Sequence, residues 1–311
     1  MKKQFIAAVI GAALTAGVLA GCGSSTETTA STAASSTAAA SEASSETSAA
    51  ADTSSEAASD TSAVASLGTI TVAASQTPHS EILAQAKPIL AQEGWDLEVT
   101  VFEDYVQPNN VVESGDFDAN YFQHVNYLNS FNEENGTHLV VATNGKIHYE
   151  PFGIYGGTKK SLDEIADGDA IAIPNDTTNE ARALLLLQQE GLITLNDGVG
   201  VNATVNDIKD NPYNLEIVEV EAAQVPKQLP SVAFGVINGN YALQAGLNAG
   251  TDALAVEDAS GSGAQTYANV LCVKEGREKD EAILALFKAL TSQEVKDFIN
   301  ATYQGAVVPI F

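Results

Sequence analysis

The sequence predicts an α/β fold in which residues 67–311 form two lobes, each a β-sheet flanked by helices. Roughly 245 residues follow a long Ser/Thr/Ala-rich segment, enough for one large domain or two ordinary lobes. Strand-like and helix-like segments alternate along them, which is typical of parallel sheets with helices on both faces. A more open stretch at 149–162 separates two β-α-β blocks. This separation favours two lobes joined by crossing strands.

The first block alternates from its first residues. Short alternating runs predict its strands, and longer periodic runs predict its helices, the first of which begins near Ser80 and is stopped by Gly94. Strands are expected at 69–73, 97–102, 139–142 and 152–155, and helices at 80–93, 109–114 and 127–134, with the segment 117–122 between the last two helices.

The second block has the same character. A short buried strand at 170–173 precedes a helix at 179–189, which Gly191 ends. Further strands are expected at 215–220, 233–237 and 270–273, and further helices at 224–229, 280–290 and 292–301. We assign residues 67–155 and 266–311 to the first lobe and residues 156–265 to the second.

The N-terminus has the pattern of a lipoprotein export signal. Lys2 and Lys3 precede an apolar run at 5–20 that is too short to span a membrane comfortably. Its ending, Leu19-Ala20-Gly21-Cys22, resembles the bacterial lipobox, in which the cysteine is acylated and becomes the new N-terminus. We therefore expect residues 1–21 to be a signal peptide and Cys22 to carry lipid. An ordinary signal peptide with an incidental cysteine is the alternative.

Residues 22–66 would connect this anchor to the folded part. After Cys22 the segment is almost wholly Ser, Thr, Ala and acidic residues, without any aromatic residue, Lys or Arg. It cannot bury enough apolar surface to offset its ordering entropy. We expect a disordered tether.

The formal net charge of −26 excludes some partners. Nucleic acid and anionic lipid surfaces would repel the chain, so the lipid on Cys22 would hold it at the membrane. No later apolar stretch approaches the length of about 18 residues that a membrane span needs. Cys272 has no partner once Cys22 is acylated, and we expect it to be a small buried apolar side chain.

The sequence lacks common signatures of catalysis and cofactor binding. It contains no Gly-x-x-x-x-Gly-Lys phosphate loop, no Gly-x-Ser-x-Gly elbow and no His-Glu-x-x-His. Residues 116–127 open like a calcium loop, but Tyr121 and Tyr127 replace its required Gly and Glu. We expect no cofactor, no metal and no enzymatic activity. The chain has four scattered histidines, any three of which could meet after folding: His79, His124, His138 and His148.

Arg182 is one of two arginines, and it is expected in the first turn of the helix that opens at 178–179. The helix dipole disfavours a cation there, and the Leu-rich run that follows indicates burial. A guanidinium in this place needs an anion. A ligand carboxylate bound by two hydrogen bonds would serve, and so would a structural pair with Glu180 or another acid.

A second candidate region is rich in aromatic residues, in a chain with only 6% Phe, Trp and Tyr. Aromatic rings with polar tips suit a small ligand with an apolar end, such as a thioether, although some of these rings must belong to the core. The cluster comprises Tyr105, Tyr121, Phe122, His124 and Tyr127.

Several separate motifs resemble the methionine-binding lipoproteins of the MetQ/NlpA family. The resemblance covers essentially all of 67–311 in order, but Asn126 and Thr177 stand where the family usually has proline. The motifs include Asp104-Tyr-Val-Gln-Pro-Asn, Gly115-Asp-Phe-Asp-Ala-Asn-Tyr-Phe-Gln-His, Ile173-Pro-Asn-Asp-Thr-Thr-Asn-Glu-Ala-Arg and Val236-Ile-Asn-Gly-Asn-Tyr-Ala.

The resemblance implies a periplasmic-binding-protein-like fold that closes on methionine and delivers it to the permease and ATPase subunits of an ABC importer. It implies that Arg182 clamps the ligand carboxylate, and that Asn238 and Asn269 bind its carboxylate or ammonium. Asn238 also ends an apolar strand, where a parallel sheet normally meets its ligand. The resemblance further implies a thioether pocket lined by Tyr105, Phe122, His124 and Tyr127.

Other ligands and functions stay open at this point. A methionine derivative, a methionine-containing dipeptide or another apolar amino acid could be the ligand. A hydrolase would need a nucleophile or metal constellation that the sequence does not show, and an adhesin or signalling lipoprotein would not need an Arg–Asn–Asn pocket. We expect a monomeric receptor on the outer face of a Gram-positive cell membrane.

Overall fold

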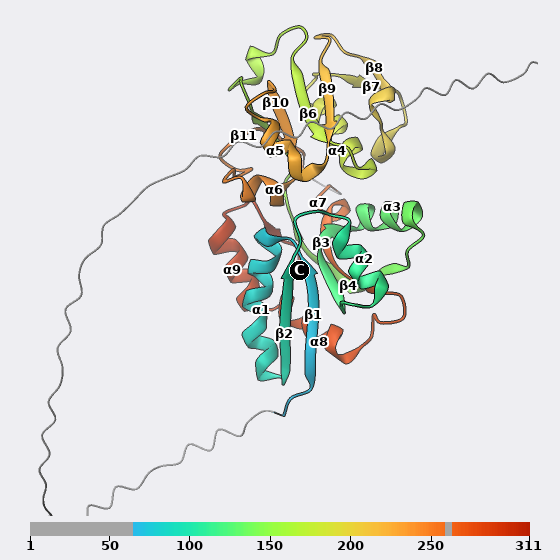
Figure 1. Cartoon of the computed structure of the whole chain (residues 1–311). Helices are drawn as coiled ribbons and strands as arrows, with labels where there is room; N and C mark the ends of the chain where they lie inside the picture. Colours follow the sequence, from blue (N-terminus) through green and yellow to red (C-terminus); the bar gives the residue numbers. More distant parts are fainter. Residues whose placement is uncertain (1–64, 259–262) are drawn as a thin grey trace, which may run out of the picture. The chain divides into compact units, whose positions relative to one another are not determined.

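In the computed structural model of this protein, residues 65–258 and 263–311 are described. The predicted signal peptide, Cys22 and nearly all of the predicted tether lie outside these residues. Two β-sheets organise the described chain, one in each of two lobes (Figure 1). No helix in this part of the chain has the length and apolar character that crossing a membrane requires.

The first lobe contains a six-stranded sheet with the strand order β13-β4-β12-β3-β1-β2. Its parallel part consists of β1 (Gly68–Ala74), β2 (Trp95–Val101) and β3 (Ala119–His124). Its antiparallel part adds β4 (Leu139–Tyr149), β12 (Ala268–Lys274) and β13 (Val308–Pro309).

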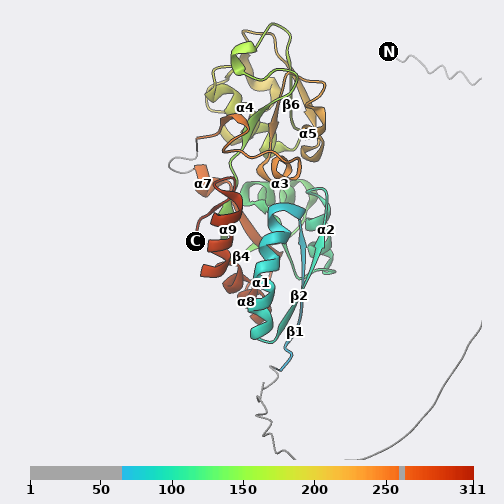
Figure 2. The ribbon, with the colours of Figure 1, turned by 90° about the vertical axis from the view of Figure 1, so that its left-hand side faces the viewer.

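Helices cover both faces of this sheet. One face packs on α1 (Glu81–Gln92), α8 (Glu281–Leu290) and α9 (Gln293–Tyr303), which Figure 2 shows side by side. The other face packs on α2 (Gln107–Ser114) and α3 (Val125–Asn135). Cys272 of β12 is fully buried on this second face, as predicted, and burial raises the pKa of its thiol.

The second lobe contains a five-stranded sheet with the order β11-β5-β10-β6-β9. Its strands are β5 (Gly153–Gly156), β6 (Ala170–Pro174), β9 (Glu216–Val220), β10 (Phe234–Ile237) and β11 (Ala253–Val256). One face packs on α4 (Thr177–Gln189), and the other on α5 (Val225–Gln228) and α6 (Gly239–Gln244).

Smaller elements complete the described chain. They are the hairpin strands β7 (Thr194–Leu195) and β8 (Ile208–Asp210), the short helix α7 (Gly263–Thr266), the π-helical turn η1 (Gln76–Ser80), and the 3-10 turns η2 (Leu162–Glu164), η3 (Gly200–Asn202), η4 (Val205–Asp207) and η5 (Ala222–Gln224).

The chain passes between the two sheets twice, from β4 to β5 and from β11 to β12. The strand that leaves a lobe and the strand that returns to it run in opposite directions. Each sheet therefore contains antiparallel strands beside the parallel strands that were predicted. Three of the four residues of β5 fall within the range 67–155, yet this strand pairs with β10 and β11 of the second sheet. We propose that the first lobe ends near Glu150 instead.

β4 extends to Tyr149, well past the predicted end at residue 142. Thr143 and Gly145 within it have positive φ angles of 55° and 46°. This irregularity shifts the register with β12 and breaks the alternation of apolar side chains on which the prediction relied. The longer strand brings His148 and Glu150 to the crossing between the lobes.

Candidate ligand-binding site

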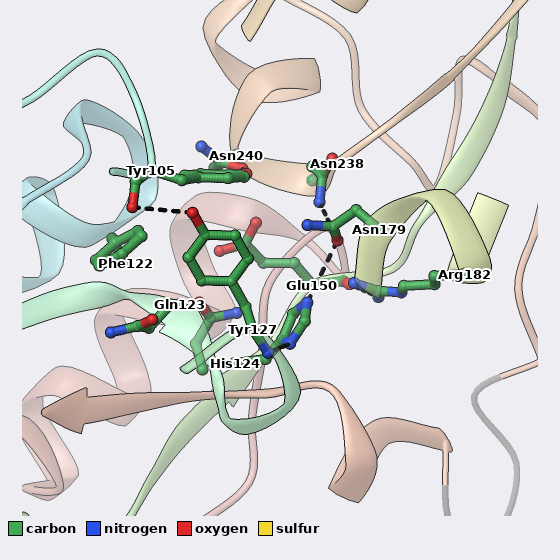
Figure 3. Close-up of a pocket in the computed structure, with 12 residues that line it drawn as sticks. Tyr105, Phe122, Gln123, His124, Tyr127, Glu150, Asn179, Arg182, Asn238 and Asn240 are labelled. Atoms are coloured by element: carbon green, nitrogen blue, oxygen red, sulfur yellow. Dashed lines mark hydrogen bonds between the residues drawn. The ribbon is translucent and has the colours of Figure 1, made fainter. Parts of the chain in front are cut away.

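A small hollow with a cavity volume of about 20 Å³ lies between the lobes, with side chains of both in its wall (Figure 3). All seven residues that the resemblance implied line it: Tyr105, Phe122, His124, Tyr127, Arg182, Asn238 and Asn269. Five more residues contribute: Gln123, Glu150, Asn179, Gly239 and Asn240.

One side of the hollow is aromatic and is built mainly by the first lobe. Strand β3 is buried along its whole length and places Phe122 there, while α3 places Tyr127. The Tyr105 ring lies 5.7 Å from that of Phe122 and 5.6 Å from that of Tyr127, measured between centroids. The Tyr105 hydroxyl donates to Asn240 Oδ1 at 2.5 Å, so this ring also contacts α6.

The opposite side is polar, and Figure 3 shows Asn179, Arg182 and Asn238 together there. Asp176 caps α4 by accepting a hydrogen bond from the Asn179 N–H at 3.1 Å. Asn179 Oδ1 accepts from Asn238 Nδ2 at 2.8 Å and from His124 Nε2 at 3.3 Å. The amide of Asn179 therefore joins the second lobe to the end of β3.

Arg182 is the sixth residue of α4, because the helix begins at Thr177 and is capped by Asp176. The prediction that it occupies the first turn is wrong, and the argument from the helix dipole no longer applies to it. The guanidinium donates to Glu257 through Nε at 2.8 Å and through Nη2. It also lies 4.1 Å from the Tyr267 ring centroid and 4.7 Å from that of Phe152. Glu257, and not Glu180, is thus its acidic partner in the protein.

Two buried amide atoms in residues of this wall have no hydrogen-bond partner among the described residues. They are the acceptor Asn238 Oδ1 and the donor Asn240 Nδ2. A buried polar group without a partner costs about 1–3 kcal/mol. A ligand that offers both a donor and an acceptor would remove this cost.

Behind the hollow, buried polar side chains of the first lobe surround Glu150. His148 Nε2 lies 2.7 Å from Glu150 Oε1, and its Nδ1 meets the Tyr121 hydroxyl. His79 Nε2 lies 3.5 Å from the same oxygen and 3.0 Å from Asn269 Oδ1, and its Nδ1 lies 2.7 Å from Ser75 Oγ. Asn269 thus connects the network to the hollow.

This network is also the one group of described side chains with the spacing of a metal site. The ligating atoms of His79, His148 and Glu150 lie within 4.8 Å of one another. Both nitrogens of each ring already have protein partners, and a metal ion would have to displace the hydrogen bond between His148 and Glu150. The contacts around Glu150 are those of a carboxylate held by hydrogen bonds rather than those of a prepared metal site.

Burial controls the charges of these groups. It lowers the pKa of His79 to about 4 and that of His148 to about 3, so both rings are neutral near pH 7. Burial also lowers the pKa of His124 to about 3, and nearby Arg182 contributes to this shift. Burial raises the pKa of Glu150, although His79, Arg182 and the backbone N–H of Asn240 oppose the rise.

Sequence reasoning missed several of the lining residues for different reasons. Gln123, Asn179 and Asn240 lie within the family motifs, next to residues that were selected. Position in those motifs could have identified them. Glu150 carries no such signal, and neither does Glu257, which pairs with Arg182 but does not line the hollow; the two lie at the two crossings between the lobes.

Comparison with known proteins identifies the family of this chain. Residues 70–311 match the family described as NlpA lipoprotein. The methionine-binding lipoprotein MetQ of Bacillus subtilis (strain 168) is 42% identical over 244 residues, which are 78% of this chain and 88% of that protein.

Two solved structures are similar over the folded part. A lipoprotein from Ruminococcus gnavus is 67% identical with a TM-score of 0.76, over 78% of this chain and 99% of that chain. A nutrient-binding protein from Burkholderia cenocepacia, solved bound to methionine, is 41% identical with a TM-score of 0.74, over 78% of this chain and 100% of that chain. The match to the family spans both lobes, and the chain belongs to the NlpA lipoprotein family.

Proposed function

We propose that this protein captures methionine outside the cytoplasm and delivers it to an ABC importer. The proposal draws support from the MetQ relative and from the related structure with bound methionine. The protein would act by binding alone, without catalysis, and its lobes would close around the ligand before they meet the permease.

The observation that carries the proposal is the division of one small hollow into an aromatic side and a polar side. Tyr105, Phe122 and Tyr127 would contact an apolar thioether, for which aromatic rings are suitable partners. Arg182 would bind the carboxylate through its remaining Nη1 donor, and Asn240 Nδ2 would supply a second donor. Asn238 Oδ1 would accept from the ammonium group. These partners match a free amino acid with an apolar side chain.

The placement of the polar partners argues against the alternative of a dipeptide, because the groups proposed to bind the ammonium and the carboxylate line the same wall. Another apolar amino acid remains the more serious competitor. Only the shape of the aromatic side would discriminate it from methionine, and such discrimination is typically modest.

Location and partners complete the proposal. Cys22 would carry the lipid, and residues 23–66 would let a monomeric receptor move near its permease and ATPase. A lipid anchor of this kind suits a Gram-positive cell, in which an unanchored receptor would diffuse away.

Calorimetric titration tests the ligand directly. Bound ligand is first removed by unfolding in denaturant and refolding, and the protein is then titrated with L-methionine, D-methionine, L-leucine and a methionine-containing dipeptide. We expect one site per chain that prefers methionine. Absence of binding, together with a different small molecule seen in native mass spectra of the unstripped protein, would overturn the proposal.

A further inference from the structure

Glu150 is the one acidic residue among those that line the hollow, all of which are described. It follows β4 directly, at the first crossing between the lobes, and is only 5% exposed. A carboxylate at this depth is costly unless a positive or hydrogen-bonding partner compensates for the lost water. A buried carboxylate at this position therefore indicates a partner that compensates for this cost.

The protein supplies hydrogen bonds to this carboxylate but no fixed cation. Among the described residues, no lysine or arginine nitrogen lies within 4.0 Å of the Glu150 carboxylate. Arg182 donates to Glu257 and to the backbone oxygen of Glu150, at 3.0 Å, rather than to its side chain. The two imidazoles that face Glu150 are neutral near pH 7.

The proton positions in the network agree with an ionised Glu150. Asn269 Oδ1 can only accept, so His79 carries its proton on Nε2 and accepts from Ser75 through Nδ1. With Tyr121 as the donor to His148 Nδ1, the His148 Nε2–H donates to Glu150 Oε1. The His148 N–H thus donates to one carboxylate oxygen, and the His79 N–H, which donates to Asn269, lies 3.5 Å from the same oxygen.

The other carboxylate oxygen lies against Gly239, at the start of α6. A Cβ atom added to Gly239 would lie 2.8 Å from Glu150 Oε2 and 2.6 Å from its Cβ. Residue 239 must therefore lack a side chain if Glu150 is to keep its position. The partnerless acceptor Asn238 Oδ1 belongs to a residue that lines the same hollow, so its wall holds two acceptors.

We propose that Glu150 is the counter-ion of the ligand's α-ammonium group, and that His79 and His148 are positioning residues that hold its carboxylate in place. The inference rests on the proposed function and deepens it. It makes a free ammonium a condition for binding. Amino acids acylated on nitrogen and the corresponding desamino acids are rejected even when they carry the correct thioether.

A thermodynamic cycle between protein and ligand tests the counter-ion. Wild type and Glu150→Gln are titrated with L-methionine and with 4-(methylthio)butanoate, which has the same carboxylate and thioether but no amine. Glu150→Gln should weaken L-methionine binding by roughly 100-fold, because it removes one partner of a buried charge pair. It should leave binding of the desamino acid unchanged or improve it.

The matched control is Glu103→Gln, which removes the same charge from an exposed residue outside the hollow and should change neither affinity. Equal losses for both ligands in Glu150→Gln would overturn the inference, because Glu150 would then maintain only the shape of the wall. An unchanged preference for L-methionine would overturn it as well. If wild type does not bind L-methionine, it is the proposed function that fails.

The positioning role predicts a shift in pH dependence. Acid should weaken L-methionine binding as Glu150 takes up a proton, since the group that binds the ammonium loses its charge. The groups that face this carboxylate are His79, His148, Arg182 and the Asn240 N–H, with Tyr121 behind His148. His148→Asn removes one donor, so the loss of affinity should begin at a higher pH than in wild type.

His138→Asn is the control, because the His138 side chain is 67% exposed and pairs with Glu113 away from the hollow. His79→Asn serves as the second variant if His148→Asn does not fold, and it should shift the profile in the same direction. A loss of affinity that is equal at every pH would overturn the positioning role.

Discussion

The two sides of the hollow differ in how the chain builds them. The aromatic side comes largely from one continuous segment, residues 105–127, which belongs to the first lobe. The polar side is assembled from α4, from the start of α6 and from the two crossings, whose residues are far apart in sequence. Arg182 and Glu257, for example, are separated by 75 positions.

This difference indicates that the polar side depends on lobe closure more than the aromatic side does. The aromatic rings contact one another within a single lobe, with centroids 5.6–6.1 Å apart, so they can form before the lobes meet. The polar side has contacts that reach across the lobes, such as the one between His124 and Asn179. Variants in the two sides should therefore fail in different ways.

The largest effect is expected on the polar side, from Arg182→Met. Arg182 is buried and Glu257 is partly buried, with side chains 5% and 12% exposed, and breaking a pair at this depth costs about 3 kcal/mol of unfolding free energy. Methionine binding should also be lost. Arg277→Met is the control, because its pairs with Asp118 and Asp280 are 37% exposed at the arginine and should contribute about 1 kcal/mol or less. Urea unfolding and calorimetry measure both quantities, and a stable Arg182→Met that still binds methionine would contradict the comparison.

On the aromatic side, Phe122→Ala should cost about 3 kcal/mol of unfolding free energy, because the ring is 3% exposed. It should also weaken methionine binding by roughly 10- to 100-fold through lost apolar contact. Phe298→Ala, which removes a ring packed on the core of the same lobe, should lower stability without changing affinity. Equal affinity losses in both variants would mean that Phe122 acts only through stability.

A smaller effect concerns pH. Because the pKa of His124 is lowered to about 3, the unfolded chain takes up a proton below about pH 6.5 that the folded chain does not. As the pH is lowered, the unfolding free energy should therefore decrease by about 1.4 kcal/mol per pH unit from this residue, down to about pH 3. The raised pKa values of Glu150 and Asp176 act in the opposite direction.

The contribution of His124 is obtained by difference. His124→Gln should reduce the acid sensitivity by that slope, measured from urea unfolding between pH 6.5 and 5. His138→Gln should not, because its side chain is 67% exposed. An unchanged slope in His124→Gln would show that His124 does not remain neutral in the folded protein.

The smallest effect is expected where the two sides meet, from Tyr105→Phe. The variant keeps the ring but removes the donor to Asn240 Oδ1, which should cost about 1 kcal/mol and weaken binding several-fold. Tyr213→Phe, on a half-exposed tyrosine away from the hollow, should change neither stability nor affinity. If Tyr105→Phe matches that control, the contact between Tyr105 and α6 does not stabilise the closed site.

The fold was predictable wherever the apolar pattern is regular. The prediction for 170–173 matches β6 closely, and that for 280–290 matches α8, because burial on a defined face imposes a clear period. The pattern failed for β4, where positive φ angles at Thr143 and Gly145 break the alternation. It also placed the start of α4 too late, because the cap is Asp176 rather than Thr178.

The sequence by itself determined the order of most strands and helices, though not α6, β11 or β13, together with the aromatic segment and the family motifs, since these depend on neighbouring residues. It also carries the lipobox-like ending at Cys22 and the acidic segment proposed as a tether, almost all of which lies outside the described residues. The tertiary structure alone decided that Glu257 pairs with Arg182 and that Glu150 lies against Gly239 and two buried histidines. Periodicity reports which face of an element is buried, but only packing decides which buried faces meet.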